Sequence, residues 1–349
     1  MNKLFYIFIS TILIFSACNK NTEQTPFDLF TKKVHIQCQK IETESEFIGK
    51  GGEMIFFEKP QQLIIHDWAN TEYLLKRISL NDGNNVSQFA SVGNGPEEFI
   101  HLNLVQKISD SSFLIQDIDR GLIYEMNVNT GYLNQVFDYQ GDECFDIIRL
   151  KHSYIGTGIF SKGMFALWKK DSMSPAKFVY QYPDDGTESN TPSKAMAYQG
   201  KMLKRNSQDR FVFASSGCAY FEIFKLDSDS LISVKKQLNG QFNYAPSTGN
   251  NIYAKIDSKN SEGYVDAYTT EKYIYLLYSG RVSQNSDLES IERSILSNHI
   301  LVFTWDGEPV VEYETDVDLK NFCVSDSDDI LYAIAYTPDP QLVSFVLEQ

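Results

Sequence analysis

Short apolar segments recur along the chain from residue 62 onward, and polar turns separate them. Six of them are rich in β-branched, aromatic and leucine residues, as buried β-strands are: Gln62–Asp67, Phe113–Asp117, Tyr154–Thr157, Phe211–Ala214, Tyr273–Tyr278 and Ile330–Tyr336. Successive segments lie 41 to 62 residues apart. Recurrence at this spacing is typical of the blades of a β-propeller.

Each segment belongs to a repeating unit of four strands. An apolar run precedes it, and tight polar turns such as Ser109–Ser112 and Thr269–Lys272 join the two, which predicts a hairpin. A third strand follows in every unit: Tyr73–Ile78, Leu122–Val128, Phe165–Lys169, Tyr220–Leu226, His299–Thr304 and Leu342–Leu347. A fourth follows a Gly/Asn/Asp turn, as in Leu133–Phe137 and Val310–Glu314. The pattern therefore predicts an all-β chain.

The two ends of the chain complete one unit. The sixth unit stops at Gln349 after three strands, while Lys33–Ile41 precedes the first full unit, which begins near Glu53. Pairing of Lys33–Ile41 with the last blade would remove two exposed sheet edges. We therefore predict a six-bladed β-propeller over residues 33–349, its ring closed by an N-terminal strand.

The connections between strands differ in length on the two faces of such a ring. We label the four strands of each blade A to D from the axis outward. The A–B and C–D connections then lie on one face of the ring, and the B–C and D–A connections lie on the other. The long segments all belong to the second kind: Phe89–Phe99, Pro183–Gly200, Asn243–Glu262 and Arg281–Asn298, the last with a predicted helix at Ser286–Asn298. Loops on a rigid scaffold often carry binding residues, so we expect this face to be the recognition surface.

Four residues of these loops are candidate ligand contacts. Tyr198, Tyr244 and Tyr253 would offer aromatic surface and Arg281 a positive charge. The alternative is that these side chains pack the loops together. For Trp68, Trp168 and Trp305, which lie in or beside strands, core packing is the expectation.

The N-terminus has the features of an export signal. Residues 1–17 contain one lysine, an apolar run from Leu4 to Phe15 that is short for a membrane span, and then Ser16-Ala17 before Cys18. Ser-Ala-Cys resembles the cleavage motif of bacterial lipoproteins, with Phe15 in place of the usual leucine. We expect a signal peptide over 1–17, lipid on Cys18 and a flexible tether over 18–32; the alternative is an ordinary signal peptide.

Charge and cysteine usage limit the partners. The net charge is −15 and no dense Lys/Arg cluster occurs along the sequence, which argues against nucleic acid as a ligand. The cysteines after Cys18 are far apart and form no Cys-x-x-Cys: they are Cys38, Cys144, Cys218 and Cys323. This spacing favours free, buried thiols over a zinc site.

Two stretches resemble one known family. These are Tyr275–Arg281 followed by Ile300–Val310, and Val92–Phe99 (VGNGPEEF), which is similar to a Gly-x-Gly-Pro-Gly-Glu-Phe signature with Glu97 in place of a glycine. The chain thus resembles the TolB-like six-bladed propeller lipoproteins of Bacteroides-type bacteria. The resemblance implies the fold and the export route, and it implies no catalytic residue.

No reaction motif stands out. The Gly93–Pro96 stretch lacks the spacing and the Lys-Ser/Thr of a phosphate loop, and Ser215–Cys218 is not a nucleophile elbow. The five histidines are scattered, and acidic stretches such as Asp117–Asp119 and Asp326–Asp329 are expected to be solvated turns, with calcium ligation as the alternative.

These observations favour a binding or scaffolding protein over an enzyme. We expect an exported lipoprotein, anchored in the cell envelope at the outer membrane with its propeller facing the periplasm or the cell surface. Its ligand would be a glycan, a peptide or an envelope protein. The alternative is a calcium-dependent hydrolase or lyase of the lactonase type with its site at the central channel.

Overall fold

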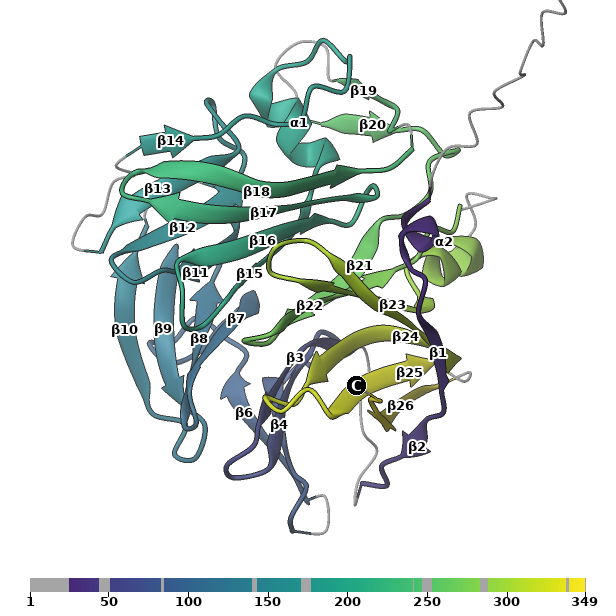
Figure 1. Ribbon diagram of the computed structural model, residues 1–349. Coiled ribbons are helices and arrows are strands. Elements are labelled where there is room, and N and C mark those ends of the chain that lie inside the picture. The colour runs from purple at the N-terminus through teal and green to yellow at the C-terminus, as the bar shows by residue number, and fades with distance from the viewer. Residues whose placement is uncertain are drawn as a thin grey trace, which may run out of the picture.

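The computed structural model describes residues 25–43, 51–82, 85–139, 143–170, 177–240, 242–246, 253–282, 288–336 and 339–348. Over these residues the chain forms a ring of antiparallel sheets, as Figure 1 shows. The predicted signal peptide and Cys18 lie outside the described residues.

The first four blades are separate four-stranded sheets, each running from an inner to an outer strand. Blade 1 contains β3 (Gly51–Phe57), β4 (Gln62–Asp67), β5 (Tyr73–Ser79) and β6 (Asn85–Ser91). Blade 2 contains β7 (Leu102–Ser109), β8 (Ser112–Asp117), β9 (Leu122–Asn127) and β10 (Leu133–Asp138). Blade 3 contains β11 (Cys144–Arg149), β12 (Ser153–Gly158), β13 (Phe165–Lys169) and β14 (Lys177–Val179). Blade 4 contains β15 (Gly200–Lys204), β16 (Arg210–Ser215), β17 (Tyr220–Asp227) and β18 (Ser230–Leu238).

The last two blades share one long strand. Blade 5 contains β21 (Tyr264–Thr269), β22 (Tyr273–Tyr278) and β23 (Ser297–Thr304), and its outer strand is the first half of β24 (Pro309–Val324). The second half of β24 is the inner strand of blade 6, where it pairs with β25 (Ile330–Tyr336), which in turn pairs with β26 (Pro340–Val346). These blades therefore have no loop between them.

The N-terminal segment closes the ring, but only its second part pairs as predicted. Strand β2 (Gln39–Lys40) pairs antiparallel with β26 at Val343 and Ser344, which completes blade 6. Strand β1 (Lys33–Ile36) instead pairs in parallel with residues 312–315 of β24, so it extends blade 5. The prediction that all of Lys33–Ile41 joins the last blade was thus wrong for β1. The first half of β24 is the outer strand of blade 5, and its outer edge pairs with β1 before the chain reaches blade 6. In Figure 1 the purple β1 runs beside the yellow β24.

The N-terminal segment contacts blade 5 before residue 33 as well. Residues Pro26–Leu29 form a short 3-10 turn (η1) within the segment predicted to be a tether. The ring of Phe27 lies 5.1 Å from that of Tyr278, and that of Phe30 lies 5.0 Å from that of Phe303. These contacts attach the segment to blade 5, because burial of Phe30 and partial burial of Phe27 offset the loss of chain freedom.

The core lies between neighbouring blades rather than inside one sheet. Apolar side chains of adjacent sheets meet in clusters around the ring, and one such cluster joins blade 1 to blade 6 through Met54, Phe56, Ile334 and Leu342. The inner strands β3, β7, β11, β15, β21 and the second half of β24 contact one another in that order around the axis. The ring is therefore closed by packing as well as by β2.

Two insertions carry the helices. Helix α1 (Thr191–Ala197), which the sequence did not predict, and the small hairpin of β19 (Tyr244–Pro246) and β20 (Ala254–Ile256) lie in connections on either side of blade 4. Helix α2 (Leu288–Ser294) confirms the helix predicted in the B–C connection of blade 5. Within the described residues, no helix is long and apolar enough to cross a membrane.

Candidate functional site

The central channel is lined by one polar side chain from each inner strand. These residues are Glu53, Asn103, Asp146, Lys201, Asp266 and Asn321. We call them the channel ring. Each lies within the first three residues of its inner strand, or of the inner half of β24, near the B–C and D–A connections. Four of the strands are bulged at or beside this residue, which turns a polar side chain towards the axis although its neighbours follow the strand alternation.

Two of the ring carboxylates also join blades. Asp146 Oδ2 accepts a hydrogen bond from the backbone N–H of Met202 at 2.7 Å, which joins blade 3 to blade 4. Asp266 Oδ2 accepts one from Phe322 N–H at 3.0 Å, which joins blade 5 to blade 6. Charge-assisted bonds of this kind satisfy backbone donors that no strand pairing reaches. Both carboxylates therefore position the inner strands as well as lining the channel.

Lys201 supplies the positive charge of the channel ring. Its Nζ lies 2.7 Å from Asp266 Oδ1. Burial disfavours the charged ammonium, but attraction to Asp266, Glu53 and Asp146 outweighs it and raises the pKa of Lys201. The channel ring thus contains three carboxyl groups and one lysine, so its acidic groups outnumber its basic group.

The three carboxylates differ in their ionisation. Burial raises the pKa of Asp146 to about 7, against the opposing effects of the Met202 N–H and Lys201. Burial acts in the same direction on Glu53, but its hydrogen bond with His66 and the charge of Lys201 outweigh it and lower the pKa of Glu53. One acid of the channel ring thus titrates near neutral pH while another stays ionised.

A stack of side chains connects the channel ring to the surface. Glu53 Oε2 lies 3.0 Å from Nδ1 of the buried His66, and the imidazole lies 4.2 Å from the indole ring of Trp68. Gly52 makes room for this arrangement, because a Cβ there would lie 2.2 Å from Trp68 Nε1. Trp68 is 48% exposed, so the expectation that it packs in the core was wrong, whereas Trp168 and Trp305 are buried.

The channel widens into a cavity at each mouth. On the face of the B–C and D–A connections, which we call the long-loop face, the cavity measures about 380 Å³ and contains the channel ring together with Gln199 and Ser216. We call it the long-loop cavity. On the opposite, short-turn face, the short-turn cavity measures about 340 Å³. Glu53, Leu104 and Lys201 line both cavities and so lie at the neck between them.

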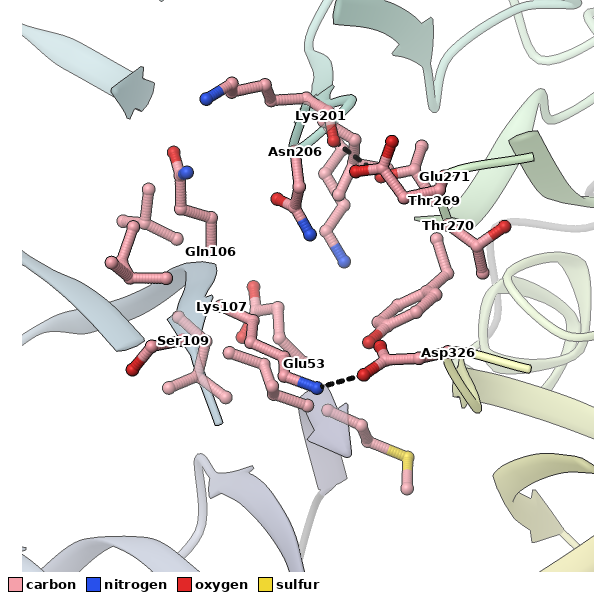
Figure 2. Close-up of a pocket in the computed structure, with 18 of the residues that line it drawn as sticks. Glu53, Gln106, Lys107, Ser109, Lys201, Asn206, Thr269, Thr270, Glu271 and Asp326 are labelled. Carbon is pink, nitrogen blue, oxygen red and sulfur yellow. Dashed lines mark hydrogen bonds and ion pairs between the residues drawn. The ribbon is translucent and has the colours of Figure 1, made fainter. Parts of the chain in front are cut away.

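The short-turn cavity is shown in Figure 2. Lys107 and Asp326 approach each other from different blades, with Nζ and Oδ2 2.6 Å apart. The Lys107 ammonium also lies 5.4 Å from the centre of the Phe57 ring. The A–B turns of blades 4 and 5 contribute Asn206 and Glu271 to the rim.

Exposed apolar side chains gather on the long-loop face. Of the large hydrophobic residues exposed in the described chain, those in loops of this face are Trp68, Val92, Ile100, Tyr253, Ile256, Val282, Ile291 and Ile295. Tyr132, Ile232 and Val346 lie elsewhere. Exposed apolar surface concentrated on one face is typical of an interaction site.

The candidate contacts named from the sequence occupy three different situations. Tyr198 and Tyr244 are buried, and both hydroxyls donate to Asp185 Oδ2, at 2.9 and 3.0 Å. Arg281 forms a two-point ion pair with Asp318 at 3.0 and 2.5 Å, which fixes the blade 5 insertion to the middle of β24. Tyr253 is 43% exposed on the long-loop face. The structure thus places the first three in packing and pairing roles, and their role in binding stays a prediction.

The acidic turns considered as calcium ligands have protein partners. Asp117 pairs with Arg120 at 2.8 Å, and Arg120 also donates to the carbonyls of Gly95 and Glu98, so it anchors the Gly93–Phe99 loop. Asp328 is buried and accepts from Thr270 and Tyr275 of blade 5. No group of three His, Cys, Asp or Glu in the described part of the chain is arranged to hold a metal ion.

The cysteines agree with the expectation of free thiols. Cys144, Cys218 and Cys323 are buried and Cys38 is half-buried, and none of the four is in a disulfide. Burial raises the pKa of Cys218 to about 12, so this thiol is not a nucleophile at neutral pH.

Comparison with known proteins agrees with this architecture. The model of the TolB-like six-blade propeller family matches residues 30–327. The chain belongs to this family. A search among curated proteins finds no match.

Solved structures of the same fold extend over most of the chain. A predicted exported protein of Bacteroides fragilis superposes with a TM-score of 0.53 and 13% identity, covering 90% of this chain and 95% of its own. A member of the DUF4221 family from Bacteroides vulgatus gives 0.54 and 12%, covering 90% and 98%. A gluconolactonase from Xanthomonas campestris gives 0.51 and 11%, covering 86% and 87%. At these identities the likeness shows the TolB-like propeller fold alone.

Proposed function

We propose that this TolB-like propeller is an exported, lipid-anchored binding protein that receives a polar group of its ligand in the long-loop cavity. The observation that carries the proposal is the channel ring, in which six separate strands each place a polar side chain around one cavity of about 380 Å³. Convergent polar groups in a cavity of this size are typical of ligand sites on rigid scaffolds.

The surroundings of the cavity support a glycan, peptide or envelope protein as the ligand. Exposed apolar residues, with Trp68 beside the channel, surround a polar centre on this face. An interface with apolar contacts around a few polar anchors suits a macromolecular partner or a sugar that stacks on an aromatic ring.

Export and lipid attachment rest on the N-terminal sequence. Residues 1–17 have the charge and length of a signal peptide, and Cys18 follows two small residues. One structural relative from Bacteroides is itself a predicted exported protein. The lipid would hold the propeller at the outer membrane.

The calcium-dependent hydrolase stays an alternative prediction, and metal analysis of the purified protein would test it. Bound calcium at one equivalent, with lactone hydrolysis lost on chelation, would favour it over the binding role. Its ligands would have to converge at the channel, where an ammonium group, Lys201, lies among the carboxylates.

Blocking the long-loop cavity tests the proposal. Thermal shift with a panel of saccharides and short peptides identifies a stabilising ligand, and saturation at about 100 times Kd adds about 2.7 kcal/mol to the free energy of unfolding. Ser216 lines the cavity, so Ser216→Trp should abolish the shift. Ser258→Trp, an exposed position on the same face, should preserve it.

A shift that survives Ser216→Trp would contradict binding in this cavity. For a protein partner, hydrogen exchange of the complex would show which face of the propeller is protected by binding. Protection confined to turns such as Ser109–Ser112 and Thr269–Lys272 would place the partner on the short-turn face.

A further inference from the structure

A groove leads outward from the channel on the short-turn face, between blades 3 and 4. The short-turn cavity shares Lys204 and Asn206 with a neighbouring cavity of about 460 Å³. That cavity in turn shares Asp209 and Leu226 with a third one of about 450 Å³. The second and third cavities together form what we call the blade 3–4 groove.

The groove is basic although the protein is acidic. Its lining contains six cationic residues, which are Lys151, Lys169, Lys170, Lys204, Arg210 and Lys225. The acidic residues lining it are Asp209 and Asp229. In a chain with a net charge of −15, this local excess of positive charge is a distinct electrostatic feature.

Most of these cations are not neutralised by neighbouring carboxylates. Arg210 pairs with Asp306 at 2.9 Å, and Lys169 lies 4.0 Å from Asp229. For the other four, no carboxylate oxygen lies within ion-pair distance among the residues that the structure describes. Burial lowers the pKa of Lys204, and attraction to Asp209 and Glu271 does not outweigh this effect.

We propose that the blade 3–4 groove binds an acidic polysaccharide. Its lysines would pair with the carboxylate or sulfate groups of successive sugars, and the chain would run outward from the channel mouth. The uncharged polar lining is made of short hydroxyl and amide side chains, namely Ser153, Asn206, Ser207, Gln208 and Ser228. Such groups exchange hydrogen bonds with sugar hydroxyls.

Other polyanions fit the groove less well. A single-stranded nucleic acid would need several aromatic platforms for its successive bases, whereas the imidazole of His152 is the one ring among the described residues that line these two cavities. A peptide would need apolar anchor pockets, whereas Leu167 and Leu226 are the aliphatic side chains of the lining. A planar lipid surface would not enter a concave groove.

Binding of polygalacturonate to the purified full-length protein tests this proposal, with neutral dextran as the uncharged probe. Lys151→Gln with Lys225→Gln removes two exposed cations of the groove, and isothermal titration should show a loss of affinity of about tenfold or more. The matched control is Lys255→Gln with Lys259→Gln, two exposed lysines on the opposite face, which should bind as the wild type does.

Three results would overturn the proposal: equal affinity for dextran, equal affinity for poly-glutamate or oligo-dT, or equal loss in both lysine pairs. Binding should also weaken steeply with added salt, because the contacts are exposed ion pairs. Ser216→Trp should leave polygalacturonate binding intact. This separates failure of the groove from failure of the long-loop cavity.

Discussion

The ammonium nitrogen of Lys201 lies 2.7 Å from Oδ1 of Asp266, and this pair joins the inner strands of blades 4 and 5 inside the channel. Asp266 Oδ2 continues the connection to blade 6 through the N–H of Phe322. The Lys201–Asp266 ion pair thus belongs to the polar lining of the channel, and through Asp266 it is also connected to a backbone hydrogen bond that positions blade 6. The same residues serve the site and the stability of the ring.

Replacing Lys201 by methionine should therefore destabilise the protein. The change leaves Glu53, Asp146 and Asp266 without their counter-charge in a poorly solvated channel, and we expect a loss of roughly 2–4 kcal/mol in the free energy of unfolding. Urea denaturation would measure it, with the exposed Lys259→Met as the control. An unchanged denaturation midpoint would show that the acids are solvated well enough without Lys201.

The raised pKa of Asp146 predicts a pH dependence of stability. Its pKa is raised from 3.8 to about 7 on folding, so the folded state keeps a proton that the unfolded state has lost between these values. Stability should fall as pH rises from about 4 to 7, and then stay level with respect to this group. Because Asp146 is half-buried, we expect an effect on the order of 1–2 kcal/mol, which Asp146→Asn should remove. An equally steep pH profile in Asp146→Asn would contradict the assignment.

The strands were predictable because each blade repeats one simple pattern. The segments Tyr273–Tyr278 and Ile330–Tyr336 were predicted with the bounds that β22 and β25 have. An apolar run bounded by polar turns leaves the chain little choice of secondary structure. The pairing partner of β1 was not predictable in this way, because four residues with alternating polarity fit the free edge of either blade.

The sites were harder to predict because they combine residues that are distant in sequence. Asp146 and Asp266 reach the channel through bulges, where the alternation of inward and outward side chains is broken. The lysines of the blade 3–4 groove come from five turns and strands between residues 151 and 225, so no basic run exists in the sequence. Tyr198 and Tyr244 were expected to be ligand contacts, but they come from the two insertions on either side of blade 4 and are buried in the large apolar cluster that these insertions share with the neighbouring blades.

Cys18 is predicted to carry the lipid anchor. The residue lies outside the described part of the structure, so the argument rests on the short apolar run and the Ser-Ala-Cys sequence before it. Cys18→Ser should move the protein from the detergent-extracted membrane fraction to the aqueous fraction. Without the Cys18 thiol the acyl chains are not attached, and stable membrane anchoring depends on them. Cys38→Ser is the matched control and should leave the fractionation unchanged. Membrane association that survives Cys18→Ser would contradict lipid attachment at this position.

Removal of the N-terminal segment should open the ring. A chain beginning at Gly51 lacks β2, which completes blade 6, β1, which covers β24 of blade 5, and the Phe27 and Phe30 contacts. Two sheet edges and an apolar patch would then be exposed, and we expect a lower melting temperature and aggregation. A chain beginning at Thr25 keeps all of these contacts and should melt as the mature protein does. If the chain from Gly51 stays monomeric with an unchanged melting temperature, the packing between blades 1 and 6 holds the ring closed without this segment.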